Sequence, residues 1–174
     1  MNTLRTRFGR ESVTVTIVSA GYGLVAEDNP LVPYEATFNG MSRREALAWS
    51  RHLGIARDVR GAAKDFPLVV FLLGARYLDA LEPPVIPRAG QRFIFLAGSG
   101  NEGVVGSPGA TVVRAGPEEA TAYGSPVIAV KGRMFELFAR GIARPVGISA
   151  LRYVAQQLAP CMKLPRGWLT AQPC

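Results

Sequence analysis

The residues best suited to chemistry in this sequence lie between positions 19 and 35. They supply a hydroxyl, two glycines, two aromatic rings and several carboxylates, namely Ser19, Gly21, Tyr22, Gly23, Glu27, Asp28, Tyr34 and Glu35. Glycines beside a hydroxyl let backbone N–H groups approach an anion, and an aromatic ring offers a face on which a base can stack. A nearby carboxylate could position water, or stabilise a sugar cation, during hydrolysis of a base–sugar bond. We therefore expect a ligand site in which Tyr22 or Tyr34 stacks on a base and Asp28 or Glu35 acts in catalysis.

The same spacing also fits a purely structural role. In that interpretation Tyr22 and Tyr34 pack a loop over the core, while Glu27 and Asp28 are solvated residues of a turn. Spacing alone favours neither interpretation. A non-catalytic DNA-binding module and an enzyme acting on a free nucleotide or nucleoside are therefore kept as alternatives to a DNA glycosylase-like enzyme.

The positive charge of the chain comes almost entirely from arginine. Lysine and arginine together number 20 against 13 aspartates and glutamates, and only Lys64, Lys131 and Lys163 are lysines. Arginine suits bidentate phosphate contacts and stacking on bases. A composition rich in Ala, Arg and Gly gives the same charge without any ligand, so the clustering of the arginines is what favours nucleic acid, most simply DNA, as partner. We expect one basic surface around the cleft that holds Tyr22, formed by Arg43, Arg44, Arg51, Arg57 and Arg60.

Two further segments carry candidate ligand contacts. The glycine-rich stretch 98–103 follows an apolar run and contains Asn101, whose amide could read a base. It lacks the lysine of a P-loop and the spacing of a dinucleotide fingerprint. Lys131 lies near the start of an expected helix, where it is either a phosphate contact or a solvated flank.

We expect no metal, no cofactor and no membrane segment. The lone His52 lies inside an expected helix, and Cys161 and Cys174 have no neighbours at metal-ligand spacing. The longest apolar run, Leu68–Leu73, is far shorter than the roughly 20 residues that cross a bilayer. The first residues are charged, but the apolar stretch that follows the charges in a secretory signal is missing. These features predict a cytoplasmic protein.

Alternating strand and helix patterns predict the fold. Apolar, β-branched runs indicate strands, and periodic segments with caps indicate helices. We expect a single α/β domain over 13–160, after a basic N-terminal segment 1–12 and before a C-terminal tail 161–174. Its mainly parallel central sheet should contain residues near 13–18, 68–73 and 93–97, flanked by helices near 42–53, 126–140 and 148–158. Shorter elements are expected at 55–64, 75–81, 111–114 and from Pro117.

One motif resembles a known family. Ser19-x-x-Tyr22-Gly23-Leu24 followed by Pro33-Tyr34 is similar to the S-x-x-Y-G-L … P-Y stretch of the YaaA-type peroxide-stress proteins and their uracil-DNA-glycosylase-like relatives. The likeness spans about residues 13–97. It implies an association with DNA binding, DNA damage and stress response or defence, and it implies no particular reaction.

The chain departs from that pattern at its start. Members of the resembled family carry a strand and a basic turn many residues before the motif, whereas Ser19 is reached here after only 18 residues. Three explanations remain open. The region after Gly98 replaces the missing part, a companion polypeptide supplies it, or the chain binds DNA without catalysis.

Overall fold

The computed structural model describes residues 1–98 and 108–142, which form a mixed arrangement of helices and strands. Helix α1 (Asn2–Phe8) comes first, followed by strands β1 (Thr16–Ser19) and β2 (Gly23–Ala26) and a 3-10 turn, η1 (Phe38–Gly40). The middle of the chain contains α2 (Arg43–Leu53), α3 (Ile55–Ala63), β3 (Leu68–Phe71) and α4 (Ala75–Asp79). It continues with β4 (Arg92–Ala97), β5 (Ala110–Arg114), α5 (Pro117–Ala122) and α6 (Val130–Ile142).

The described strands form two sheets. Strands β3, β4 and β5 form a three-stranded parallel sheet in that order, with Val69 opposite Phe93 and Phe95 opposite Val112. Strands β1 and β2 form a separate antiparallel pair. The α/β character of the fold is thus confirmed, and so are the strands expected near 68–73 and 93–97.

The strand expected near 13–18 does not join the parallel sheet, so that part of the prediction is wrong. Ser19 pairs with Gly23 across a hairpin turn, which brings the chain straight back along β1. Parallel pairing needs a crossover of about a dozen residues or more, whereas a short turn can only join antiparallel strands. The segment after β1 is therefore a hairpin turn between antiparallel strands, and not a loop that follows a strand of the parallel sheet.

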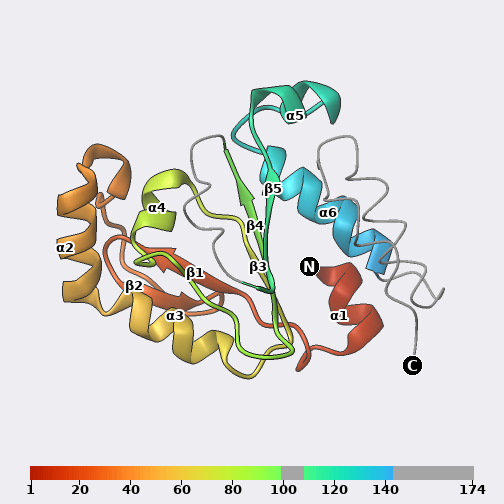
Figure 1. Ribbon diagram of the computed structural model, residues 1–174, viewed down its shortest axis with the longest axis horizontal. Coiled ribbons are helices and arrows are strands. Elements are labelled where there is room, and N and C mark those ends of the chain that lie inside the picture. Colours follow the sequence, from red (N-terminus) through yellow and green to blue (C-terminus); the bar gives the residue numbers. More distant parts are fainter. Residues whose placement is uncertain (99–107, 143–174) are drawn as a thin grey trace.

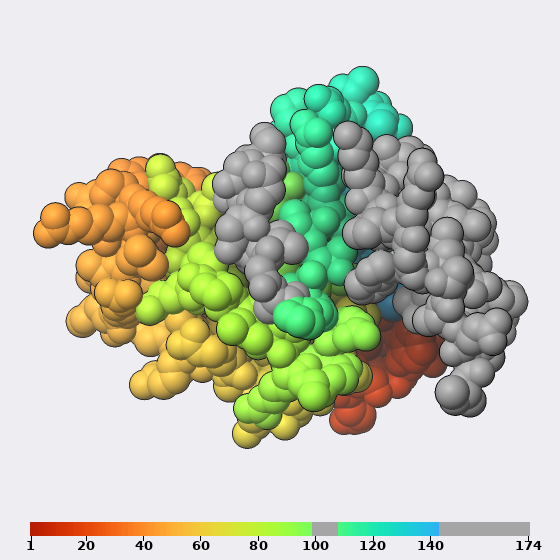
Figure 2. All heavy atoms as spheres, in the orientation of Figure 1, coloured from red at the N-terminus to blue at the C-terminus, as the bar shows by residue number. Residues whose placement is uncertain are grey.

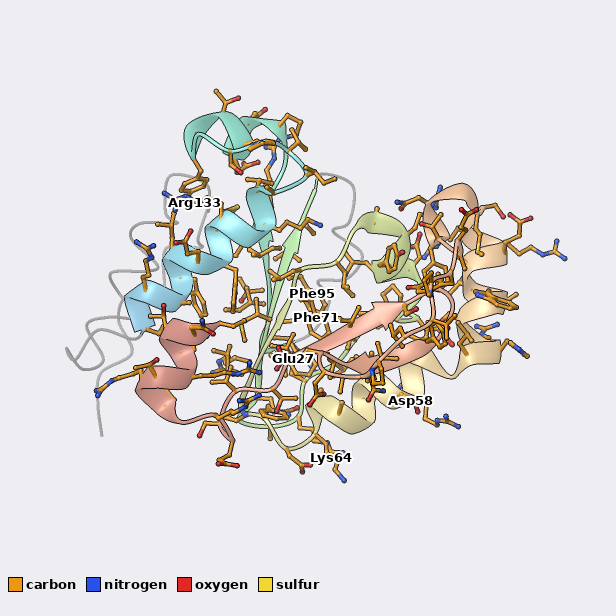
Figure 3. All side chains as sticks on the ribbon, turned by 180° about the vertical axis from the view of Figure 1, so that it is seen from behind. Glu27, Asp58, Lys64, Phe71, Phe95 and Arg133 are labelled. Atoms are coloured by element: carbon orange, nitrogen blue, oxygen red, sulfur yellow. The ribbon has the colours of Figure 1, made fainter. Side chains whose placement is uncertain are left out.

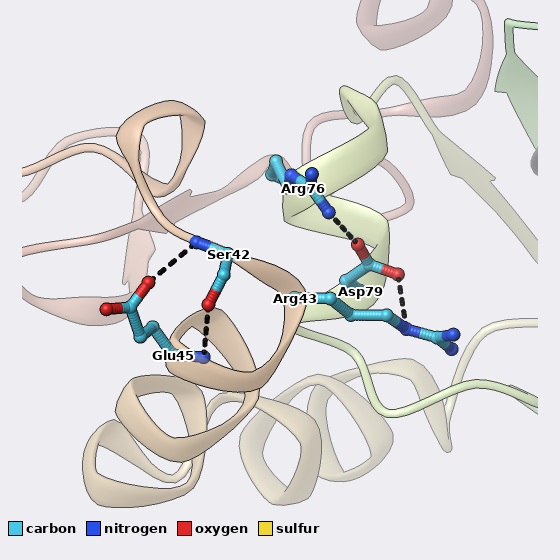
Figure 4. Close-up of polar contacts among 5 residues, drawn as sticks. All are labelled: Ser42, Arg43, Glu45, Arg76 and Asp79. Carbon is cyan, nitrogen blue, oxygen red and sulfur yellow. Dashed lines mark hydrogen bonds and ion pairs between the residues drawn. The ribbon is translucent and has the colours of Figure 1, made fainter.

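Helix α2 begins and ends where its caps predict. The Ser42 hydroxyl accepts a hydrogen bond from the Glu45 amide at 3.3 Å, and the Glu45 carboxylate accepts one from the Ser42 amide at 2.8 Å (Figure 4). Gly54 ends the helix in the left-handed conformation, at φ 68°. This capping box and C-cap satisfy backbone groups that a helix end otherwise leaves unpaired.

The parallel sheet separates two apolar clusters. Phe93 and Phe95 point to one face, where Phe71 stacks on Phe95 with ring centroids 4.4 Å apart (Figure 3). Buried residues of α2, α3 and α4 complete this cluster. Leu96 points to the other face and packs with Val113 of β5 and Met134 of α6. Figure 1 accordingly shows the hairpin, α2 and α3 on one side of the sheet and α1 and α6 on the other, and in Figure 2 the helices α2 and α3 form one end of the molecule.

The ends of the described chain differ from expectation in two places. Residues 2–8 form helix α1, which packs against α6 and buries Leu4. Helix α6 begins at Val130, four residues after the expected position 126, because residues 126–129 form turns that precede it. The helix expected at 148–158 lies outside the described residues. Within the described ranges, no helix is long and apolar enough to cross a membrane.

The buried amide of Gln91 joins α3 to the start of β4. Its Nε2 donates to the carbonyl oxygens of Ala63 and Phe66, each at 2.9 Å, and its Oε1 accepts from the Arg88 amide at 2.9 Å. Only 8% of Gln91 is exposed. One side chain therefore satisfies backbone groups at the end of α3, after it and just before β4.

Replacing Gln91 with leucine is expected to destabilise the fold by about 2–4 kcal/mol, because it leaves the buried carbonyl of Ala63 and two part-buried backbone groups without their partner. Gln91→Glu should cost more, since a carboxylate would then face carbonyl oxygens. Equilibrium unfolding in urea measures both changes. A loss below about 0.5 kcal/mol for Gln91→Leu, the size typical of surface substitutions, would contradict this role.

Candidate functional site

Ser19 is the centre of the hairpin turn. Its Oγ accepts hydrogen bonds from the backbone N–H groups of Gly21, at 3.1 Å, and Tyr22, at 3.0 Å. The same hydroxyl donates to the phenolic oxygen of Tyr34 at 2.7 Å. Only 2% of Ser19 is exposed. A single buried hydroxyl thus closes the turn and fixes the returning segment against it.

The structure explains why glycine occupies positions 21 and 23 of the turn. A Cβ at Gly21 would lie 2.7 Å from Cδ2 of Tyr34, so the tyrosine ring rests directly on the Gly21 backbone. Gly23 has φ +76°, and a Cβ there would lie 3.2 Å from the carbonyl oxygen of Leu53. Glycine is favoured at Gly21 by close packing and at Gly23 by its left-handed backbone.

Tyr22 and Tyr34 pack on each other while their hydroxyls bind within the protein. The Tyr22 hydroxyl donates to the Val32 carbonyl at 3.1 Å, and the rings meet edge to face with centroids 5.1 Å apart. Each tyrosine is nevertheless 43% exposed. The hydroxyls and glycines of the motif therefore have structural partners, while part of each ring remains accessible.

Trp49 of α2 joins this group, although its sequence position did not place it among the expected site residues. Its indole N–H donates to the carbonyl oxygen of Ala20 in the hairpin turn at 2.7 Å, and its ring stacks on His52 with centroids 5.1 Å apart. Trp49 is 38% exposed. A tryptophan within the expected amphipathic helix was the available sequence signal. We call Tyr22, Tyr34, Trp49 and His52 the aromatic surface.

The two predicted catalytic carboxylates lie in the segment between β2 and η1. Asp28 and Glu35 are both exposed, and neither makes a hydrogen bond or an ion pair with any residue that the structure describes. Glu27, by contrast, forms an ion pair with Arg5 of α1. The carboxylates at positions 28 and 35 are thus unpaired within the described chain.

Three of the five arginines expected around Tyr22 pair with carboxylates. Arg43 forms an ion pair with Asp79 at 3.3 Å, and Arg76 forms a second ion pair with Asp79 at 3.3 Å (Figure 4). Arg51 contacts Glu82 at 3.3 Å, so both pairs join α2 to α4 or to the chain just after it.

The third pair, Arg57 with Asp58 at 2.8 Å, lies within α3, and the hydrogen bond from Arg57 lowers the pKa of Asp58. Arg44 and Arg60 are exposed and have no acidic partner among the residues described. Of the five arginines, three therefore form ion pairs, and two have no acidic partner in the described part of the chain.

The remaining predicted contacts lie elsewhere. Lys131 belongs to α6, where its Nζ donates to the carbonyl oxygen of Leu73, just beyond β3. The half-burial of this amine lowers its pKa, because the charged form loses hydration. Asn101 lies outside the described residues. No group of three or more potential metal ligands occurs in 1–98 or 108–142.

Comparison with known proteins gives one match. No curated protein and no solved structure matches the chain. The sequence model of a family of unknown function, DUF6884, matches residues 3–102 of the 174, a stretch that includes the hairpin and all of α2. Because this match covers more than half of its length, the chain belongs to the DUF6884 family.

Proposed function

We propose that this protein binds nucleic acid through the aromatic surface. The observation that carries the proposal is the way its rings are held. The hydroxyls of Tyr22 and Tyr34 and the indole N–H of Trp49 all bind within the protein, yet 38–43% of each residue is exposed. Such rings are fixed before a ligand arrives and offer mainly apolar surface, which is the requirement for stacking on bases at low entropic cost.

Charge supports the same ligand class. The chain has a net charge of +7, and Arg44 and Arg60, on the helices α2 and α3, have no acidic partner in the described part of the chain. Free guanidinium groups on the helix that carries Trp49 and on the next helix suit phosphates of a strand whose bases stack on the rings. Base faces are available only in single strands or in extruded nucleotides, so we propose these rather than intact duplex as the ligand.

The resemblance to the YaaA-type and uracil-DNA-glycosylase-like proteins favours DNA over RNA, and we propose a role in DNA damage, stress or defence on that basis. We also propose that the parallel sheet is the centre of one α/β domain and that the protein acts in the cytoplasm. These proposals rest on the alternation of strands and helices and on the resemblance.

A narrower proposal is that the chain hydrolyses a base–sugar bond of a damaged or modified base. Asp28 and Glu35 favour it, because both lie in the segment bound to the hairpin and neither carboxylate is committed to an ion pair within the described ranges. Either could orient water or stabilise the sugar cation beside a base held on Tyr22 or Tyr34. A non-catalytic DNA-binding module needs the aromatic surface alone. An enzyme acting on a free nucleotide would be stabilised by that nucleotide without DNA.

Removing the Tyr22 ring is expected to weaken binding of a single-stranded DNA oligonucleotide by about 1–3 kcal/mol, the usual contribution of one stacked base. Tyr22→Phe removes only the exposed hydrogen bond to Val32 and should keep the affinity close to that of the wild type. Fluorescence anisotropy measures affinity, and thermal unfolding of each variant corrects for lost folding. Phe8→Ala is the matched control, because Phe8 is an exposed aromatic residue of α1 across the sheet. Equal affinities for wild type and Tyr22→Ala would assign the ring to the fold alone.

Neutralising Arg44 is expected to reduce the slope of log affinity against log salt by about one unit for each phosphate that the protein no longer neutralises. Arg133→Gln is the control, since Arg133 pairs with Glu136 at 2.8 Å on the helix α6. Titrations of the oligonucleotide at several salt concentrations give the slope for each variant. If Arg44→Gln leaves the slope unchanged, Arg44 does not bind phosphate.

Asp28→Asn and Glu35→Gln test catalysis separately from binding. DNA carrying modified bases is incubated with the protein and then cut with alkali at abasic sites. If the chain is a glycosylase, one of these variants should lower cleavage by at least about 100-fold, as removal of a general acid or base does, while oligonucleotide affinity is retained. Absence of abasic sites with every modified base tested, together with retained oligonucleotide affinity, would contradict the glycosylase proposal and favour the non-catalytic module.

A further inference from the structure

Lys131 brings a cation to the carboxyl edge of the parallel sheet. It is the second residue of α6, a helix that packs on the face of the sheet formed by Leu96 and Val113. Its Nζ reaches the carbonyl oxygen of Leu73, two residues beyond the end of β3. In open α/β sheets, ligands bind outside the carboxyl ends of the parallel strands. The amine of Lys131 therefore lies at the carboxyl edge of the sheet, the edge at which open α/β sheets bind ligands.

The charge of this amine is not neutralised by the described protein. No carboxylate of the described ranges pairs with Lys131, although the side chain is half-buried and desolvation lowers its pKa. The bond to Leu73 uses one of the three N–H donors of an ammonium group. Lys64 differs in both respects, because it is exposed and lies 4.0 Å from the carboxylate of Asp65. An anion would offset the cost of the buried charge of Lys131 and occupy its remaining donors.

Glycines follow the parallel strands at this edge. Each parallel strand is followed within three residues by a glycine, namely Gly74, Gly98 and Gly116. A Cβ at Gly74 or Gly98 would meet no other atom of the described residues within 4 Å, apart from immediate chain neighbours. Gly74 has φ −71°, so its backbone conformation does not require glycine. Glycine at such positions lets a ligand approach the backbone N–H groups closely.

We propose that Lys131 binds the phosphate group of a phosphomonoester at the carboxyl edge of the parallel sheet. This site goes beyond the proposed function, because Lys131 belongs to α6 whereas the aromatic surface belongs to the hairpin and α2. Phosphate fits better than a carboxylate because it has three terminal oxygens, and an ammonium together with backbone N–H groups can bind several of them at once.

Acylation of lysines in the wild-type protein tests this site directly. The protein is treated with a limiting acylating reagent at constant ionic strength, with and without inorganic phosphate, and each lysine is quantified by peptide mass spectrometry. At a phosphate concentration about ten times the dissociation constant, the acylation rate of Lys131 should fall about tenfold, since only the free amine reacts. Lys64 is the internal control, because it lies before β3, at the opposite end of the sheet from α5 (Figure 3), and should keep its rate.

Two variants and a second ligand complete the experiment. Calorimetric titration of Lys131→Met should show at least about fivefold weaker phosphate binding, Lys131→Arg should retain it in part, and Lys64→Met should match the wild type. Adenosine monophosphate should protect Lys131 and adenosine should not, if the phosphate is what is bound. Equal protection of both lysines, or none at Lys131, would overturn the proposal. Because no nucleic acid is present, this outcome is independent of whether the aromatic surface binds DNA.

Discussion

The arrangement of the hairpin and its surroundings depends on the buried hydroxyl of Ser19. This group accepts two backbone N–H bonds within the turn and donates a third bond to Tyr34, fifteen residues further along the chain. A buried polar atom with all of its partners rigidifies the structure around it. Because the Tyr34 ring lies on the Gly21 backbone, and Trp49 binds the carbonyl of the neighbouring Ala20, two further segments of the chain are held against one turn.

The proposed function uses this arrangement, because the same motif that shapes the hairpin also offers a surface to a ligand. The polar atoms of its tyrosines are used for folding, so what remains for a ligand is ring surface. A platform built this way loses little conformational freedom on binding, which is how rigid aromatic residues contribute affinity at interfaces. The motif thus needs no catalytic group of its own to bind bases. Hydrolysis of a base–sugar bond would need a catalytic group as well, and the exposed carboxylates of Asp28 and Glu35 are the candidates.

Much of the fold could be predicted from local sequence patterns. Features that depend on contacts between residues far apart in sequence could not. The Ser42–Glu45 capping box and Gly54 set the ends of α2 within a few residues, and the apolar runs at β3 and β4 were sufficient to identify those strands. The position of β1 was predicted wrongly, because the glycine-containing segment after it was interpreted as a ligand loop rather than as a turn leading into the partner strand β2. Trp49 was missed at the site because its bond to Ala20 spans 29 residues. Which arginines were free also depended on carboxylates of α4 and beyond, as the Arg43–Asp79 and Arg51–Glu82 pairs illustrate.

The emission of Trp49 tests most directly whether unstacked bases bind the aromatic surface. The chain contains two tryptophans, so Trp168→Phe leaves Trp49 as the only one. Titration with a single-stranded oligonucleotide should quench this emission, with the same dissociation constant that anisotropy gives, because a stacked base touches the indole directly. The same sequence presented as an intact duplex should quench it little. Saturated oligonucleotide binding without any change in Trp49 emission would contradict the account.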